Sequence, residues 1–109
     1  MNHMRKLVLL ALPAILAAQT PNAQNGKKIF DGYGCYQCHD HDGHGGAGAR
    51  LAPNPIPFPA FSKYVRQPTG EMPPYTKKVV TDQELQDIYA YLQSIPQPTP
   101  AKNIPILNK

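Results

Sequence analysis

The segment Cys35-Tyr36-Gln37-Cys38-His39 contains both cysteines of this 109-residue chain. Side chains three positions apart lie on the same face of a helical turn, so the two thiols are expected to point in the same direction. His39 follows the second cysteine directly and adds an imidazole. Two thiols and an imidazole this close together predict a site for a metal or a metal-containing cofactor.

The C-x-x-C-H spacing is typical of the place where c-type haem is attached. Cys35 and Cys38 are therefore predicted to hold one haem c through two thioethers, with His39 as the proximal ligand of the iron. Three alternatives stay open at this point. They are a simple disulfide, a thioredoxin-like redox pair, which would need a βαβ context, and a zinc site of Cys35, Cys38, His41 and His44.

Met72 is the predicted second axial ligand. Residues 19–109 hold no other methionine, and the two prolines that follow Met72 stiffen its loop. A thioether is a soft ligand that suits iron and raises the reduction potential of a haem. The alternatives are Met72 as a core residue, or ligation by His41 or His44, which would require a sharp reversal of the chain.

Residues 1–18 have the pattern of a secretory signal peptide. Arg5 and Lys6 precede the apolar run Leu7–Ala18. As a helix this run would reach about 18 Å, less than the roughly 30 Å of a hydrocarbon core, so no stable membrane insertion is expected. We predict cleavage near Ala18–Gln19 and a periplasmic or secreted location. An uncleaved N-terminus that anchors the protein to a membrane is the alternative.

Composition excludes several classes of protein. The chain is too short for a multidomain enzyme or a polytopic membrane protein. It carries 11 Lys and Arg against 7 Asp and Glu, and loss of Arg5 and Lys6 with the signal peptide leaves a net charge of +2. This charge is too small and scattered to indicate nucleic-acid binding. Only 41% of the residues are hydrophobic, so a cofactor is expected to support folding.

Local patterns predict an all-α fold with long loops. We expect a short helix over Asn25–Gly34 with Asn25 as its cap, an extended path over Pro53–Pro59, and one or two helical turns at Phe61–Val65. The clearest helix follows Thr81, which forms a predicted capping box with Glu84. Pro96 ends that helix.

The last predicted helix has an apolar face formed by Leu85, Ile88, Tyr89 and Leu92. We assign residues 19–95 to one domain and residues 96–109 to a Pro-rich tail, which is expected to be extended or disordered. The sequence leaves open whether apolar residues of the tail pack on the domain.

Residues 26–95 resemble a class I c-type cytochrome, the small kind with a single haem. The motifs that carry the resemblance are Gly26-x-x-x-Phe30, Cys35-x-x-Cys38-His39, Met72-Pro73 and Leu85-x-x-Ile88-Tyr89-Ala90-Tyr91-Leu92. The resemblance implies a small cytochrome c-like fold in which the first and last helices cross around the haem cavity. Gly26 would permit the close approach, and Phe30, Ile88 and Tyr91 would fill the contact.

One part of the chain departs from this family pattern. Many members have Gly-Pro-x-Leu after the haem motif, whereas this chain has Gly48-Ala49-Arg50-Leu51. Without the proline, the backbone carbonyl that accepts a hydrogen bond from His39 is not identified. The stretch from His39 to Met72 is also short, so we expect a reduced central helix and one open haem edge.

The resemblance implies an electron carrier rather than an enzyme. We expect a monomer that exchanges electrons with redox proteins such as a dehydrogenase or a terminal oxidase. A haem-based gas or peroxide binder or sensor, with labile Met72 ligation, is the alternative.

Several residues are assigned supporting roles in this prediction. Ile56, Phe58 and Phe61 are expected to keep water from the iron. Arg50, Tyr64 and Arg66 are candidate contacts of the haem propionates. Lys27-Lys28 and Lys77-Lys78 either guide an acidic partner or form ordinary solvated surface.

Overall fold

The computed structural model describes Pro13 and residues 19–109. The predicted signal peptide, residues 1–18, lies outside the described residues except for Pro13. Within the described part the chain forms helices and loops and no strand, which confirms the predicted all-α cytochrome c-like fold. The elements are α1 (Ala23–Gly32), α2 (Tyr36–His39), α3 (Phe58–Arg66), α4 (Asp82–Ser94), and the 3-10 turns η1 (Ala101–Asn103) and η2 (Pro105–Leu107).

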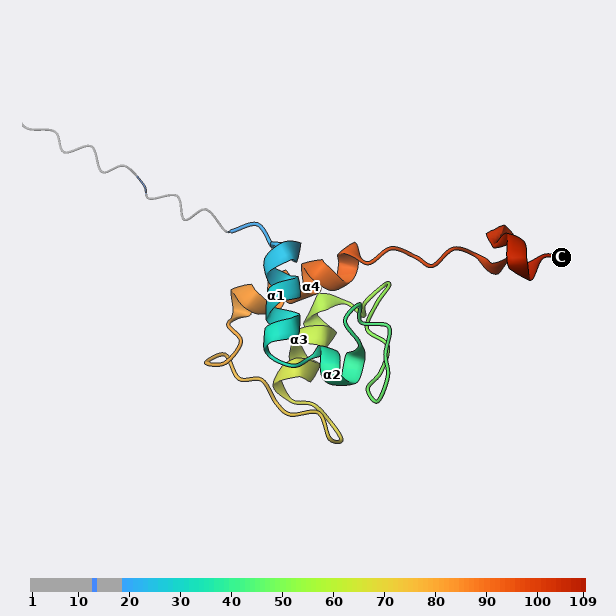
Figure 1. The fold of residues 1–109 in the computed structure, drawn as a ribbon. Helices are drawn as coiled ribbons and strands as arrows, with labels where there is room; N and C mark the ends of the chain where they lie inside the picture. The colour runs from blue at the N-terminus through green and yellow to red at the C-terminus, as the bar shows by residue number, and fades with distance from the viewer. Residues whose placement is uncertain (1–12, 14–18) are drawn as a thin grey trace, which may run out of the picture.

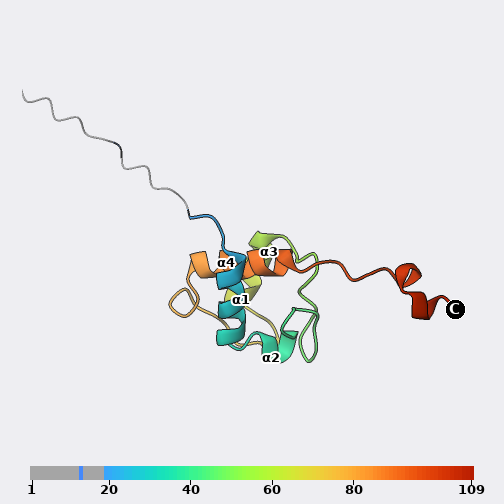
Figure 2. The same ribbon diagram turned by 45° about the horizontal axis from the view of Figure 1, so that its top comes forward.

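The crossing of α1 and α4 is the main contact between helices (Figures 1 and 2). A Cβ atom at Gly26 would collide with the backbone carbonyl of Asp87, so only glycine permits this approach. Beside the crossing, the rings of Phe30 and Tyr91 meet edge to face with centroids 5.7 Å apart. Phe30, Ile88 and Tyr91 are all buried, as predicted.

The helix α1 begins earlier than predicted. Asn22, not Asn25, is the cap, and its side-chain oxygen accepts a hydrogen bond from the backbone N–H of Asn25 at 3.0 Å. The side chain of Asn25 instead donates to Asp87 across the crossing at 2.8 Å. The helix also ends at Gly32 rather than Gly34, because Gly34 has φ +81°, which is incompatible with helix.

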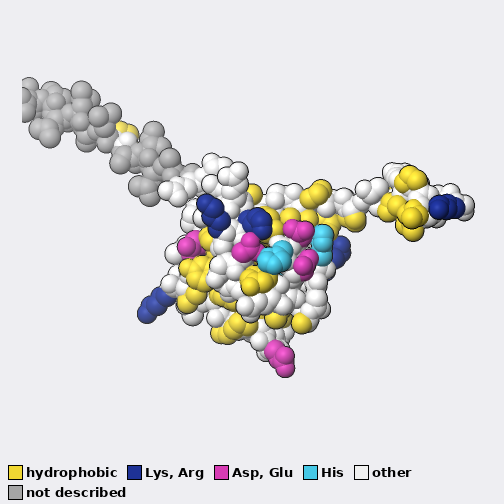
Figure 3. All heavy atoms as spheres, in the orientation of Figure 1, with side chains coloured by type: hydrophobic (Ala, Val, Ile, Leu, Met, Phe, Trp, Pro, Cys, Tyr) yellow, Lys and Arg dark blue, Asp and Glu magenta, His cyan; other side chains and the backbone are white. Residues whose placement is uncertain are grey.

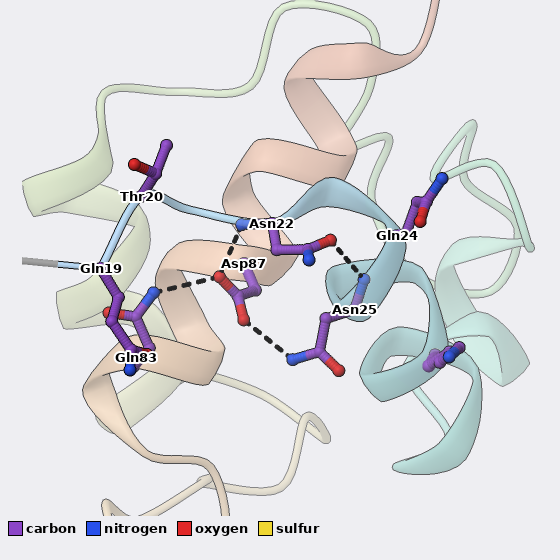
Figure 4. Close-up of a pocket in the computed structure, with 8 residues that line it drawn as sticks. Gln19, Thr20, Asn22, Gln24, Asn25, Gln83 and Asp87 are labelled. Carbon is purple, nitrogen blue, oxygen red and sulfur yellow. Dashed lines mark hydrogen bonds between the residues drawn. The ribbon is translucent and has the colours of Figure 1, made fainter.

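Asp87 is buried and connects α4 to the start of α1 (Figure 4). Its carboxylate accepts from the backbone N–H of Asn22 (2.8 Å), from Asn25 and from Gln83 (3.1 Å). Burial raises the pKa of Asp87, but these hydrogen bonds outweigh burial and hold the pKa below its ordinary value. The carboxylate therefore stays charged at neutral pH and fixes the entry of the chain into α1.

A polar cavity of about 450 Å³ opens beside Asp87. Its walls come from the segment before α1, from α1 and from α4, and contain none of the predicted haem-site residues. The lining residues are Gln19, Thr20, Asn22, Gln24, Asn25, Lys28, Gln83 and Asp87.

The helix α3 includes residues that were predicted to be extended. It starts at Phe58, so Pro59 lies in its first turn. A proline is tolerated there because the N–H that it lacks would have no partner within the helix. The helix α4 has the predicted capping box at Thr81 and Glu84 and ends at Ser94.

The tail leaves the helical body after α4 and runs away from it (Figures 1 and 2). It is more regular than predicted, because Asn108 donates to the carbonyls of Ala101 and Ile104, both at 2.9 Å, and so closes the two 3-10 turns. Ile106 and Leu107 do not pack on the domain but are exposed, and hydrophobic atoms are visible at the end of the tail in Figure 3.

Replacement of Gly26 tests the helix crossing. Gly26→Ala is expected to lower the free energy of unfolding by about 1–3 kcal/mol, because the added methyl forces α1 away from α4. Gly32→Ala is the matched control, since a Cβ there meets nothing within 4 Å. It should leave stability unchanged or raise it by up to about 1 kcal/mol. Urea titrations of the two variants measure the difference, and equal stabilities would contradict the proposed role of Gly26.

Candidate functional site

The two cysteines and the histidine share one short helical turn. Gly34, with its positive φ, lets the chain pass from α1 into α2, and the N–H of Cys35 donates to the carbonyl of Phe30 at 3.1 Å. The N–H of His39 in turn donates to the carbonyl of Cys35 at 3.1 Å. Both thiols are free, with Cys35 half-buried and Cys38 exposed. Burial raises the pKa of the Cys35 thiol.

The ring of His39 is held by the loop that follows it. Its Nδ1 lies 2.7 Å from the carbonyl oxygen of Ala49. A carbonyl only accepts, so Nδ1 carries the proton and Nε2 keeps its lone pair for a metal. Ala49 occupies the position of the proline in the family pattern, and its carbonyl therefore fills the role that the sequence left unassigned.

Gly48 forms a close wall beside this ring. A Cβ at Gly48 would lie 2.8 Å from Cε1 and 3.0 Å from Nδ1 of His39. The N–H of Gly48 also donates to the carbonyl of Cys38 at 2.7 Å, which draws the loop against α2. The orientation of the imidazole is thus set by backbone groups on both sides.

Met72 lies half-buried in the loop between α3 and α4. Tyr75 attaches this loop to the rest of the fold. Its N–H donates to the carbonyl of Val65 at 3.1 Å, and its hydroxyl donates to the carbonyl of Tyr33 at 3.0 Å. Burial raises the pKa of Tyr75, and the neighbouring Cys35 raises it further. The loop that carries Met72 therefore reaches the cysteine helix.

Sequence reasoning did not identify Tyr75 or the carbonyl of Ala49 as part of the site. The position of Ala49 in the Gly-x-x-Leu pattern was a usable signal. No local pattern in the sequence marks the partner of Tyr75, because Tyr33 lies 42 positions away.

The three candidate propionate contacts have different surroundings. Arg66 donates to two backbone carbonyls and to Asp82, but its Nε is buried and no atom among the described residues accepts a hydrogen bond from it. Tyr64 is 42% exposed, with its hydroxyl 2.9 Å from Oγ1 of Thr69. Arg50 is exposed. A buried N–H without an acceptor is costly, so a carboxylate at this point would be favourable.

The predicted apolar wall forms only in part. Phe61 is buried, and Phe58 packs against it and against Tyr89, with centroids 6.5 and 5.2 Å away. Ile56 is 55% exposed, and its carbonyl accepts a hydrogen bond from the hydroxyl of Tyr89 at 2.9 Å. Its expected role in keeping water from the iron stays a prediction.

The zinc alternative has no support in the geometry. Among residues 19–109, no group of three or more His, Cys, Asp or Glu side chains is placed to hold a metal. His41 stacks on Tyr36 with centroids 4.3 Å apart, and its Nδ1 lies 3.1 Å from Asp31. Histidine and acidic side chains accordingly lie next to one another on the face shown in Figure 3.

Residues 21–92 match the sequence profile of the family described as cytochrome c oxidase, cbb3-type, subunit III. The match covers more than half of the chain. The chain belongs to this family. Its members are c-type cytochromes, which confirms the resemblance and indicates haem c binding and electron transfer rather than catalysis.

Searches among curated proteins and among solved structures found no significant match to this cytochrome. The family is associated with oxidase complexes. In the part of the chain that the structure describes, no helix has both the length and the apolar character needed to cross a membrane.

The residues present fit a haem c. Two free thiols lie on one turn, and the residue after Cys38 is His39, whose Nε2 carries no proton and can bind iron. The backbone of Gly48 packs closely against the ring of His39, an arrangement called the cradle below. The buried Nε of Arg66 has an N–H that is free to donate to a haem propionate.

Gly48→Ala tests the cradle around His39. The added methyl should tilt the ring and break the hydrogen bond to Ala49. Loss of such a partner weakens metal binding about 10- to 100-fold and makes the imidazole a poorer donor. We therefore expect a lower yield of haem-loaded protein and a higher reduction potential. Gly46→Ala is the control, because a Cβ there meets only the carbonyl of Cys38 at 3.3 Å. Matching potentials in the two variants would argue against the cradle.

Proposed function

We propose that this cytochrome is an electron carrier with one haem c attached to Cys35 and Cys38 and with His39 and Met72 as axial ligands. The observation that carries the proposal is the hydrogen bond from Nδ1 of His39 to Ala49, directly beside two free thiols. It leaves Nε2 as the metal-binding atom and fixes its direction.

Met72 is proposed as the second ligand because its loop is stiffened by prolines and attached by Tyr75 to the turn before α2. The bound haem supplies an iron that cycles between the ferric and ferrous states. If His39 and Met72 both bound the iron, they would leave no coordination position open for a substrate. Phe58 and Phe61 limit the access of water, and Arg66 offers its free Nε to a propionate.

Location and partners follow from the same proposal. Residues 1–18 act as a signal peptide, and the mature protein works in the periplasm or as a secreted protein. The partners are redox proteins, of which a terminal oxidase is favoured because the family is associated with oxidase complexes. The protein acts as a monomer and binds its partners transiently.

Removal of both thiols tests the attachment. Wild-type protein made in a host with haem-ligation machinery should be coloured and heavier than its mature polypeptide by one haem. Cys35→Ala combined with Cys38→Ala should give little soluble, helical protein, because the haem completes a small apolar core. The control is Gln37→Ala, which alters an exposed residue between the thiols. A colourless wild type, or a stable and helical double variant, would refute the attachment or the dependence on haem.

Met72→Ala tests the second ligand. The variant should lose the weak long-wavelength absorption that a sulfur–iron bond gives ferric haem, and its reduction potential should fall. Ferrous variant protein should also bind carbon monoxide readily, which the wild type resists. Glu71→Ala, at an exposed neighbour, should behave as the wild type. An unchanged spectrum would remove Met72 from the site, and rapid carbon monoxide binding by the wild type would favour a gas binder.

A further inference from the structure

Arg66 extends from the last turn of α3 into the loop that carries Met72. Its Nη1 donates to the carbonyls of Tyr75 (2.9 Å) and Val80 (2.7 Å), and its Nη2 donates to Oδ1 of Asp82 (2.9 Å). The three acceptors are spread over the second half of the loop and the start of α4. One guanidinium therefore ties this whole segment to α3.

The hydrogen bonds from Arg66 to the two carbonyls are stronger than ordinary surface contacts, whereas Asp82 is 59% exposed and its bond with Arg66 contributes less. The side chain of Arg66 is only 16% exposed, and each hydrogen bond has a charged donor. Hydrogen bonds from Lys77 and from Arg66 hold the pKa of Asp82 below its ordinary value, so its carboxylate is charged at neutral pH. Lys77 is 73% exposed and contacts no loop carbonyl, so its own contribution is small.

The attachment acts close to Met72. The carbonyl of Tyr75 accepts from Arg66, while its N–H donates to Val65, the residue before Arg66. Both the N–H and the carbonyl of Tyr75 are therefore hydrogen-bonded to the end of α3. Only two prolines separate it from Met72. Because proline restricts the backbone, fixing Tyr75 also restricts where the sulfur of Met72 can lie.

We propose that Arg66 is a positioning residue that keeps Met72 on the iron. The inference rests on the proposed function, in which Met72 is an axial ligand. Without Arg66, Tyr75 keeps only the hydrogen bonds of its hydroxyl to Tyr33 and of its N–H to Val65. Met72 then leaves the iron more readily. A lysine at this position cannot replace the forked guanidinium, because a single ammonium does not span two carbonyls and a carboxylate in this geometry.

The test compares Arg66→Leu and Arg66→Lys with the control Lys77→Leu, which also removes a partner of Asp82 but leaves the loop carbonyls bound. None of these variants adds a second thioether. Ferric protein is titrated with base while the sulfur–iron absorption is followed. In Arg66→Leu the pH at which this absorption is lost should fall by about one unit, which corresponds to a tenfold weaker hold on Met72. Carbon monoxide uptake by the ferrous variant should rise about tenfold. The values for Arg66→Lys should lie between those of the wild type and Arg66→Leu.

The outcomes separate this inference from the proposed function. A wild type without the sulfur–iron absorption overturns Met72 ligation and this inference with it. If the wild type has the absorption and Arg66→Leu matches Lys77→Leu, only the role of Arg66 is overturned. A shifted potential with an unchanged pH titration assigns Arg66 to the propionates alone and also overturns it. If Arg66→Leu yields no folded protein, Arg66→Lys decides, and a titration identical to that of the wild type refutes the inference.

Discussion

The contact between the backbones of α1 and α4 at Gly26 is the constraint on which the rest of the fold depends. It brings the carbonyl of Asp87 against α1, while the carboxylate of the same residue holds the N–H of Asn22. One residue of α4 therefore sets both the distance and the starting point of α1. The backbone N–H of Cys35 donates a hydrogen bond to the carbonyl of Phe30, which lies beside the crossing. The crossing therefore also determines where the cysteine helix begins.

The predicted haem-binding turn is oriented largely by backbone groups. The carbonyl of Ala49 fixes the proton of His39, and the missing Cβ of Gly48 leaves room for the ring. This explains how the chain can lack the proline of the Gly-Pro-x-Leu pattern at the position of Ala49. The backbone carbonyl of residue 49 can accept this hydrogen bond whatever the side chain of that residue, provided that the loop keeps its conformation.

The Met72 loop has no regular secondary structure, so its position depends on side chains from elsewhere in the chain. Tyr75 attaches it to the turn between α1 and α2, and Arg66 attaches it to α3. An electron carrier changes only the charge of its iron, and rigid ligands suit that task because little has to rearrange. In this protein the loop is also attached by the hydroxyl of Tyr64 to Thr69 and by Val80, which is buried in the apolar core.

The sequence alone determined the features that depend on neighbours three or four positions apart, such as the thiol pair, the capping box at Thr81 and the apolar face of α4. The family resemblance added the crossing at Gly26, but local patterns failed where the hydrogen-bond partner lies far along the chain. Asn25 has the chemistry of a cap, yet its side chain donates to Asp87, 62 positions away, and Asn22 caps the helix instead. The carbonyl that holds His39 and the acceptors of Arg66 were likewise decided by tertiary structure. Local spacing encodes the geometry of one helix, whereas hydrogen bonds between distant segments form only after the chain has closed around them.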